Sequence, residues 1–194
     1  MIDLVTSLFA PHGPVRIYPH YSQLVGYEWS IESELDQTFA FLLREKLNTP
    51  RLGLTRKVCA AYLAGIFDAE GSLWVTGSSF TPQLSIANKD VDLLNWAASF
   101  LEEIGLTPWT GRPDKNGVSR VALYSGGEVM RLLRTLPIRH PEKKARRKIV
   151  FDVDRPWPER LEAWDELIRM IDVDTEEFIA AAEESFKAMR GGKL

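Results

Sequence analysis

The stretch YLAGIFDAEGSLWV, residues 62–75, constrains the fold of this chain more than any other. Apolar and small residues at helical spacing predict a helix over 57–69, and the alternation after Gly71 predicts a strand. Two carboxylates, Asp68 and Glu70, therefore stand at the C-terminal end of a helix. Because that end is the negative pole of the helix dipole, acids there are unfavourable unless a cation compensates them.

Small residues in the same helix would let a second helix approach closely. Ala61, Ala64 or Gly65, and Ala69 leave the backbone thinly covered. If two such helices pack side by side, the carboxylates at their C-terminal ends meet. Carboxylates at close range favour protons or cations, and hard oxygen ligands suit Mg²⁺. Metal ions held this way can stabilise the attacking and leaving oxygens of a phosphodiester displacement.

The periodicity of residues 57–150 predicts the order α-β-β-α-β-β-α. SLWVTGSSF and PQLSIANKD alternate as two antiparallel strands, and TPWTGRP and VSRVALY as a second pair. Amphipathic helices are predicted over 90–104, where Gly105 ends the pattern, and over GEVMRLLRTL. The fold class predicted is α+β with an antiparallel sheet.

The N-terminal segment parallels the second half of this pattern. SLFAPHGPVRIYP, GYEWSIESELD and QTFAFLLREKL run helix, strand, strand, helix. We predict that residues 1–50 are a partial repeat without its first helix and hairpin, which are lost or lie upstream of Met1. Met1 would then be an internal methionine of a longer reading frame. Chance similarity of two ββα units is the alternative.

Charge divides the chain unevenly. Residues 152–194 carry 6 Lys+Arg and 12 Asp+Glu, which leaves 18 and 15 for residues 1–151. A mildly basic body could bind nucleic acid locally, although a pI of about 5.7 argues against a nonspecific polyanion binder. The domains predicted are 1–50, 51–151 and an acidic helical extension over 152–194. In the extension, a helix over 157–171 precedes a second one opened by a capping box at Asp174.

LAGIFDAEG, residues 63–71, resembles the motif of the LAGLIDADG homing endonucleases and related DNA-binding proteins. The resemblance extends over 57–150, through SIANKD before one helix and LPIRHPEKKARRK after another. It implies a homing-endonuclease-like αββαββα fold whose sheet forms a saddle on the DNA major groove, with C-terminal helices added. An ordinary amphipathic helix ending in Asp-x-Glu-Gly is the alternative.

The resemblance also assigns roles to residues of the motif. It implies that Glu70, the last acid before the final glycine, binds the divalent metal, Mg²⁺ or another cation, and is catalytic. Asp68 is assigned to the structure of the helix end. The motif helix, residues 57–70, would form a two-fold interface and so a homodimer. The interface residues implied are Ala61, Ala64, Gly65, Asp68 and Gly71.

The outward face of the two hairpins would contact double-stranded DNA. On that assignment, the residues facing bases and phosphates are Ser72, Trp74, Thr76, Ser78, Gln83, Ser85, Arg112 and Arg120. Trp74 and Trp109 either contact DNA or cover the sheet.

The segment RHPEKKARRK, residues 139–148, carries six basic residues against one acid. Members of this family commonly place a basic residue near the active site, and Arg139, Lys143 or Lys144 could serve here as a catalytic residue. A solvated helix start is the other interpretation of the segment. His140 is a weaker candidate for a general base.

These observations favour a site-specific, divalent-metal-dependent DNA endonuclease, a hydrolase of the kind active in intron homing. Cleavage of both strands requires two acidic motifs, and this chain has one. A non-cleaving DNA- or RNA-binding module, such as a regulator or splicing cofactor, and an inactive truncated remnant are the alternatives. The single cysteine, Cys59, excludes an intrachain disulfide. With no membrane segment expected, we predict a cytoplasmic, nucleoid-associated protein.

Overall fold

The computed structural model describes residues 2–35 and 55–191 and divides into two compact units. The N-terminal unit contains residues 1–45 and 168–194, and the central unit contains residues 46–167. The division passes through the last helix, α6 (Trp157–Gly191). Each unit is described separately below.

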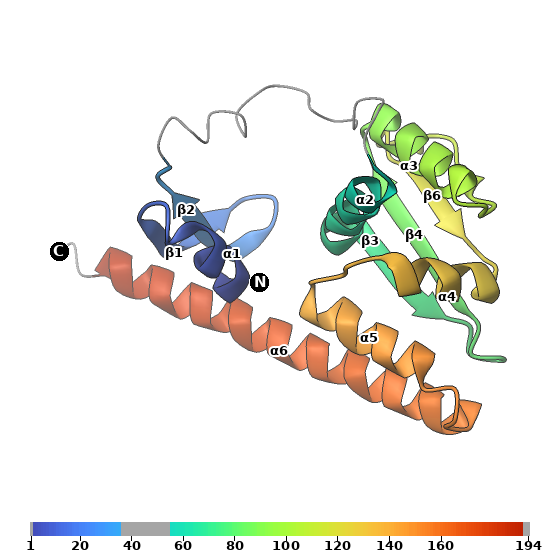
Figure 1. Cartoon of the computed structure of the whole chain (residues 1–194). Helices are drawn as coiled ribbons and strands as arrows, with labels where there is room; N and C mark the ends of the chain where they lie inside the picture. The colour runs from blue at the N-terminus through green and yellow to red at the C-terminus, as the bar shows by residue number, and fades with distance from the viewer. Residues whose placement is uncertain (1, 36–54, 192–194) are drawn as a thin grey trace. The chain divides into compact units, whose positions relative to one another are not determined.

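The central unit follows the predicted order of helices and strands. It consists of α2 (Arg56–Glu70), β3 (Gly71–Val75), β4 (Pro82–Asn88), α3 (Val91–Glu103), β5 (Trp109–Thr110), β6 (Ser119–Leu123), α4 (Gly126–Thr135) and α5 (Pro141–Phe151). The α+β prediction and the αββαββα order are therefore confirmed (Figure 1).

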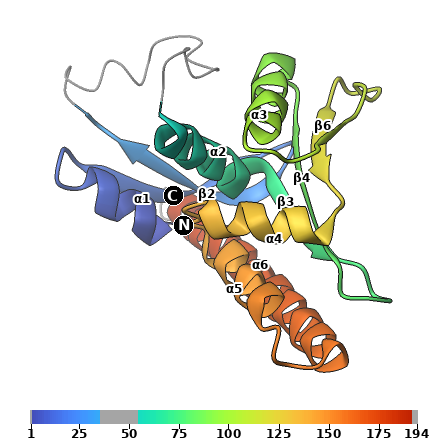
Figure 2. The ribbon, with the colours of Figure 1, turned by 45° about the vertical axis from the view of Figure 1, so that its right-hand side comes forward.

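The four strands form one antiparallel sheet in the order β3-β4-β6-β5. Helices α2, α3 and α4 cover one face of this sheet (Figures 1 and 2). Alternate strand residues point at these helices and are buried: Leu73, Leu84, Ile86, Val121 and Leu123. The opposite face carries the intervening residues and is the face predicted to meet DNA. The period-2 alternation thus separates a core face from a more polar face.

Local signals explain where the helices begin and end. Thr55 caps α2 by accepting a hydrogen bond from the Val58 N–H, and Asp90 caps α3 by accepting one from the Leu93 N–H at 3.0 Å. Gly105, with φ of +78°, ends α3 as predicted.

The first hairpin is shorter than predicted. β3 ends at Val75, so Thr76 and Ser78 lie in the hairpin turn instead of on the outward face of a strand. The Thr76 hydroxyl accepts a hydrogen bond from the Thr81 N–H at 3.1 Å, which commits it to the turn. Phe80 adopts φ of +49° there and is buried against the Trp164 ring, with centroids 6.1 Å apart. This packing holds Phe80 in a backbone region that bulky residues rarely adopt.

The N-terminal unit contains α1 (Ile2–Phe9) and a hairpin of β1 (Val15–Ser22) and β2 (Gly26–Ser33). Aromatic side chains join this hairpin to the last turns of α6: Tyr27 contacts Phe186 at 5.8 Å between centroids, and Trp29 contacts Phe178 at 6.0 Å. The helix predicted over 37–47 lies outside the described residues. The partial-repeat interpretation of residues 1–50 stays a prediction.

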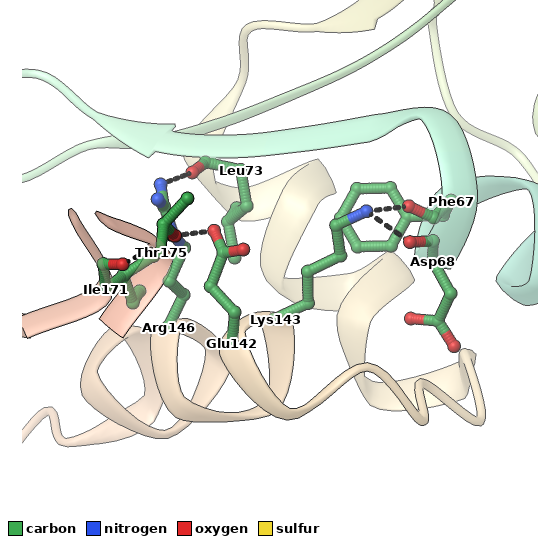
Figure 3. Close-up of polar contacts among 8 residues, drawn as sticks. All are labelled: Phe67, Asp68, Leu73, Glu142, Lys143, Arg146, Ile171 and Thr175. Atoms are coloured by element: carbon green, nitrogen blue, oxygen red, sulfur yellow. Dashed lines mark hydrogen bonds and ion pairs between the residues drawn. The ribbon is translucent and has the colours of Figure 1, made fainter. Parts of the chain in front are cut away.

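The two C-terminal helices predicted are one continuous helix, α6, so the predicted break at Asp174 is wrong. The segment between them contains neither Gly nor Pro, and the Thr175 hydroxyl donates to the Ile171 carbonyl one turn earlier at 2.7 Å (Figure 3). The apolar positions also continue in phase through the segment: Leu161, Trp164, Ile168, Ile171, Phe178, Ala182, Phe186 and Met189. Among the described helices, none is long and apolar enough to cross a membrane.

Two glycines of the LAGIFDAEG motif, Gly65 and Gly71, test how closely the end of α2 packs on β3. A Cβ on Gly71 would lie 2.1 Å from the Phe67 ring and 2.5 Å from the Phe67 carbonyl oxygen, whereas a Cβ on Gly65 meets nothing within 4 Å. Gly71→Ala should therefore lower the free energy of unfolding by about 1–3 kcal/mol. Gly65→Ala should raise it by up to about 1 kcal/mol, because alanine favours the helix. Urea titration of both variants measures the difference; equal effects would contradict the close approach at Gly71.

Candidate functional site

The site is built where α2 runs directly into β3. The Gly71 N–H donates to the Phe67 carbonyl, and Gly71 is already the first residue of the strand. Because no loop intervenes, the last turn of α2 and its acids are held at the edge of the sheet.

Lys143 of α5 lies against this helix end (Figure 3). Its side chain is 6% exposed, and its ammonium donates to the carbonyl oxygens of Phe67 and Asp68, the second at 2.7 Å. The ammonium also lies 5.1 Å from the centroid of the Phe67 ring. The cation that compensates the negative end of α2 is therefore a lysine of this chain.

Two opposing effects act on the pKa of Lys143. Burial lowers the pKa of the Lys143 ammonium, while the nearby carboxylates of Asp68, Glu142 and Glu70 act to raise it. The carboxylates thus help to keep a buried ammonium charged.

Asp68 ties α2 to the segment before α5. Its Oδ2 accepts a hydrogen bond from the backbone N–H of Arg139 at 2.7 Å. Its Oδ1 is buried, and within the described residues it has no hydrogen-bond partner. Asp68 thus lies at the helix end, where a structural role was predicted for it.

Glu70 is the acid that faces outward. It is exposed, and among residues 2–35 and 55–191 no group of three or more His, Cys, Asp or Glu side chains could hold a metal. Mg²⁺ does not require such a group, because it commonly binds through one or two carboxylates together with water and substrate phosphates. The exposed Glu70 carboxylate fits that type of site.

Arg146 joins α5 to β3, and Glu142 on the same helix orients its guanidinium. They form an ion pair at 2.8 Å, and an Arg146 Nη1–H donates to the Leu73 carbonyl at 2.8 Å (Figure 3). The Arg146 guanidinium also stacks over the Trp164 ring at 5.2 Å. Neither residue was predicted from the sequence as part of the site, although their i,i+4 spacing on a helix was an available signal.

A cleft of about 320 Å³ lies between these elements. It is lined by Asp68, Ala69, Gly71, Ser72, Leu73, His140, Glu142, Lys143 and Arg146. Burial, and then the Lys143 charge, lower the pKa of His140. A cleft lined by acids, bases and the start of a strand can hold a polar ligand group, and Glu70 stands in the chain between two of its lining residues, Ala69 and Gly71.

Lys143 is the predicted basic residue that lines the cleft. Lys144 is exposed on another side of α5 and lines a different cavity with Arg147 and Phe151. The Arg139 side chain lines a third cavity with Lys57 and Ala60, and only its backbone N–H reaches Asp68.

The predicted interface residues divide between two faces of α2. Ala61, Gly65 and Ala69 are exposed. Ala64 is 2% exposed, so its assignment to the interface is wrong. At helical spacing Ala64 shares the face of Leu63 and Phe67, which packs into the core.

The predicted DNA face is partly as expected. Ser72, Arg112 and Arg120 are exposed, and Trp74 and Gln83 are half-buried. Ser85 is 4% exposed, so it is not available to DNA in this conformation. Its strand has hydrogen-bonded partners on both sides, and a short side chain there is shielded by its neighbours. Trp109 is half-exposed and packs on Tyr124 with centroids 6.0 Å apart.

Comparison with known proteins finds a family model that matches part of the central unit. Residues 57–137 match the model of the LAGLIDADG-like domain. No curated protein matches the chain.

Solved structures with a similar fold include homing endonucleases and WhiA. The archaeal intron-encoded homing endonuclease I-Vdi141I complexed with DNA is 16% identical at a TM-score of 0.45, over 63% of this chain and 86% of its own. Full-length DUF199/WhiA from Thermatoga maritima is 13% identical at 0.49, over 91% of this chain and 54% of its own. Mesophilic variants of the homing endonuclease I-DmoI are 17% identical at 0.48, over 74% and 71%. At these scores the likeness adds no argument about function.

Lys143 should be important for stability. Lys143→Met leaves carbonyls at the end of α2 without their charged donor, so the free energy of unfolding should fall by about 2–3 kcal/mol. Lys144→Met, an exposed neighbour, should change it by less than about 0.5 kcal/mol. Urea titration compares the two. Similar values for both would show that the ammonium does not hold the helix end.

His140 should make the protein less stable in mild acid. Since the folded chain lowers the pKa of His140, the unfolded chain takes up its proton first as the pH falls below about 6.5. Stability should therefore fall through this range, down to the lowered folded pKa. His140→Gln should remove this part of the fall, as measured by thermal unfolding at a series of pH values. Parallel curves for the two proteins would contradict the shift.

Proposed function

We propose that this protein is a divalent-metal-dependent DNA endonuclease of the homing type, a proposal supported by the match of residues 57–137 to the LAGLIDADG-like domain model. It binds double-stranded DNA on the open face of the β3-β4-β6-β5 sheet and hydrolyses phosphodiester bonds beside Glu70. The observation that carries the proposal is the exposed Glu70 carboxylate at a helix end whose negative pole already has its own cation.

The sheet face supports DNA binding by its exposed polar groups. Arg120 projects from β6, Arg112 follows β5, and Ser72 begins the face next to the cleft. Arginine recognises both phosphates and guanine edges through its fork of N–H donors. The face is only mildly basic, which suits a protein that selects a sequence more than one that binds any polyanion.

Glu70 would hold the cation, with water and a DNA phosphate as the other ligands. A bound Mg²⁺ would supply charge stabilisation for the attacking and leaving oxygens. Neighbouring residues leave Glu70 available for this role. Lys143 occupies the Phe67 and Asp68 carbonyls, and Asp68 is held by Arg139, so Glu70 is the motif acid left to face the ligand.

A second acid is needed for cleavage of both strands, and a second copy of this chain would bring it. The exposed face of α2 carries small residues at interface spacing, namely Ala61, Gly65 and Ala69. Two such faces can approach closely because little side chain separates the backbones. In that arrangement the two Glu70 carboxylates meet at the C-terminal ends of the paired helices.

The non-cleaving alternative uses the same sheet to bind nucleic acid, but it gives the Glu70 carboxylate no role. A DNA- or RNA-binding module has no need of an exposed carboxylate beside bound phosphates, because it repels them. The presence of Glu70 therefore favours the endonuclease.

Glu70→Gln separates these functions. It removes the charge that holds the cation while preserving the side-chain shape, so Mg²⁺-dependent nicking of a supercoiled plasmid library with randomised inserts should be abolished. DNA binding should remain nearly intact, measured by fluorescence anisotropy. Glu102→Gln, an exposed glutamate on α3, is the matched control and should cut like the unaltered protein.

Two results would count against the proposal. Cleavage that survives in Glu70→Gln would remove Glu70 from the reaction. A strictly monomeric solution mass by light scattering, with and without DNA, would remove the second carboxylate and limit the protein to binding or nicking.

A further inference from the structure

The second flank of α5 carries a cluster of cations that the candidate site does not use. Arg134 lies in the last turn of α4, and Lys144, Arg147 and Lys148 lie on α5. The guanidinium groups of Arg134 and Arg147 lie over the ring of Phe151. We call these four residues the α4–α5 basic patch. Arg134, Lys144 and Lys148 are exposed and Arg147 is half-buried.

The ring of Phe151 stacks with the guanidinium groups of Arg134 and Arg147. The guanidinium carbons of Arg134 and Arg147 lie 5.4 Å and 5.8 Å from the centroid of this one ring. A guanidinium that stacks on a ring keeps its in-plane N–H groups free to donate. Among residues 2–35 and 55–191, the hydrogen bond found for these two groups is a long one of 3.4 Å, from an Arg147 Nη1–H to the Leu136 carbonyl. Stacking therefore holds two forks of donors in place before any ligand binds, which reduces the entropy lost on binding.

The charges of the patch are not balanced locally. Lys144, Arg147 and Lys148 line a shallow groove of about 730 Å³ with Ile138, Phe151 and Asp152. Asp152, the acid among these lining residues, forms an ion pair with Arg155 at 3.2 Å. Lys144 and Lys148 are four residues apart on one helix, a spacing at which like charges repel. Helix C-termini favour cations, but two helix ends do not require four of them.

The patch is separate from the cleft. Lys143 and Arg146 line the cleft from one side of α5, whereas Lys144 and Lys148 line the groove from another. Arg134 belongs to α4, which covers the core face of the sheet, opposite the face proposed for DNA (Figure 2).

We propose that the α4–α5 basic patch binds backbone phosphates of double-stranded DNA, as a second contact outside the segment that lies on the sheet. This inference rests on the proposed DNA-binding function. Paired guanidinium forks match phosphate oxygens, and exposed lysines add point charges along the backbone. The patch adds affinity without sequence readout, since phosphate contacts carry no base information.

The test measures the salt dependence of DNA binding by the full chain. Lys144→Gln/Lys148→Gln removes two cations and spares the stacked arginines. The logarithm of the association constant for a duplex of about 60 base pairs should then fall less steeply with the logarithm of salt, by about 1.8. The loss of affinity between about 50 and about 200 mM salt should accordingly be about tenfold smaller than in the unaltered protein.

Lys89→Gln/Lys187→Gln is the matched control, because it removes the same charge from exposed positions before α3 and on α6. It should keep the slope of the unaltered protein. Circular dichroism and thermal unfolding check that both variants are folded. If the two double variants share one slope, the patch does not contact DNA and the inference is overturned.

Arg112→Gln/Arg120→Gln on the sheet tells the two proposals apart. If this variant binds like the unaltered protein while the patch variant loses slope, the sheet assignment fails and the patch stands. If the patch variant keeps its DNA binding but loses solution mass by light scattering, the patch binds an acidic protein surface instead of DNA. Absence of duplex binding by the unaltered protein overturns both proposals.

Discussion

The candidate site depends on one interaction, the donation of the Lys143 ammonium to the carbonyl oxygens at the C-terminal end of α2. A helix that ends in two acids next to its own negative pole would otherwise repel any phosphate. With the ammonium in place, Asp68 is bonded to the Arg139 backbone and Glu70 alone faces outward. The Lys143 ammonium thus compensates the negative end of α2 and leaves one carboxylate, that of Glu70, exposed.

The α5 helix serves more than one surface. Its Lys143 and Arg146 side chains donate hydrogen bonds to carbonyl groups of α2 and β3, and the stacking of Arg146 on Trp164 adds a further contact. The ion pair of Arg146 with Glu142 lies within α5 and orients the guanidinium. Its other flank carries Lys144 and Lys148 without such partners among the contacts described above. The cations of this basic segment therefore differ in their surroundings: Lys143 and Arg146 are bonded to carbonyl groups, whereas Lys144 and Lys148 are exposed. Hydrogen bonding to carbonyl groups is what distinguishes the two pairs.

Much of the fold could be predicted from local pattern. Helical spacing over LAGIFDAEG, the alternation after Gly71 and the glycine at 105 determine the αββαββα order, because period and backbone freedom are properties of short segments. The same reasoning failed where the outcome depends on length or packing. Thr76 and Ser78 continue an alternating pattern, yet the strand ends at Val75 and the chain turns so that Phe80 packs on Trp164. Asp174 resembles a cap, but without a preceding breaker the helix continues through it.

The sequence by itself determined the motif, the two acids at a helix end and the placement of a basic segment after α4. Only the tertiary structure decided which of these residues meet. Adjacent positions such as Lys143 and Lys144, or Ala64 and Gly65, are almost equivalent in a pattern, whereas on a helix they point about 100° apart. One of each pair packs into the protein and the other faces solvent. Which face packs is determined by contacts with segments more than seventy residues away in the chain, as between Lys143 and Phe67, and such contacts leave no local signal.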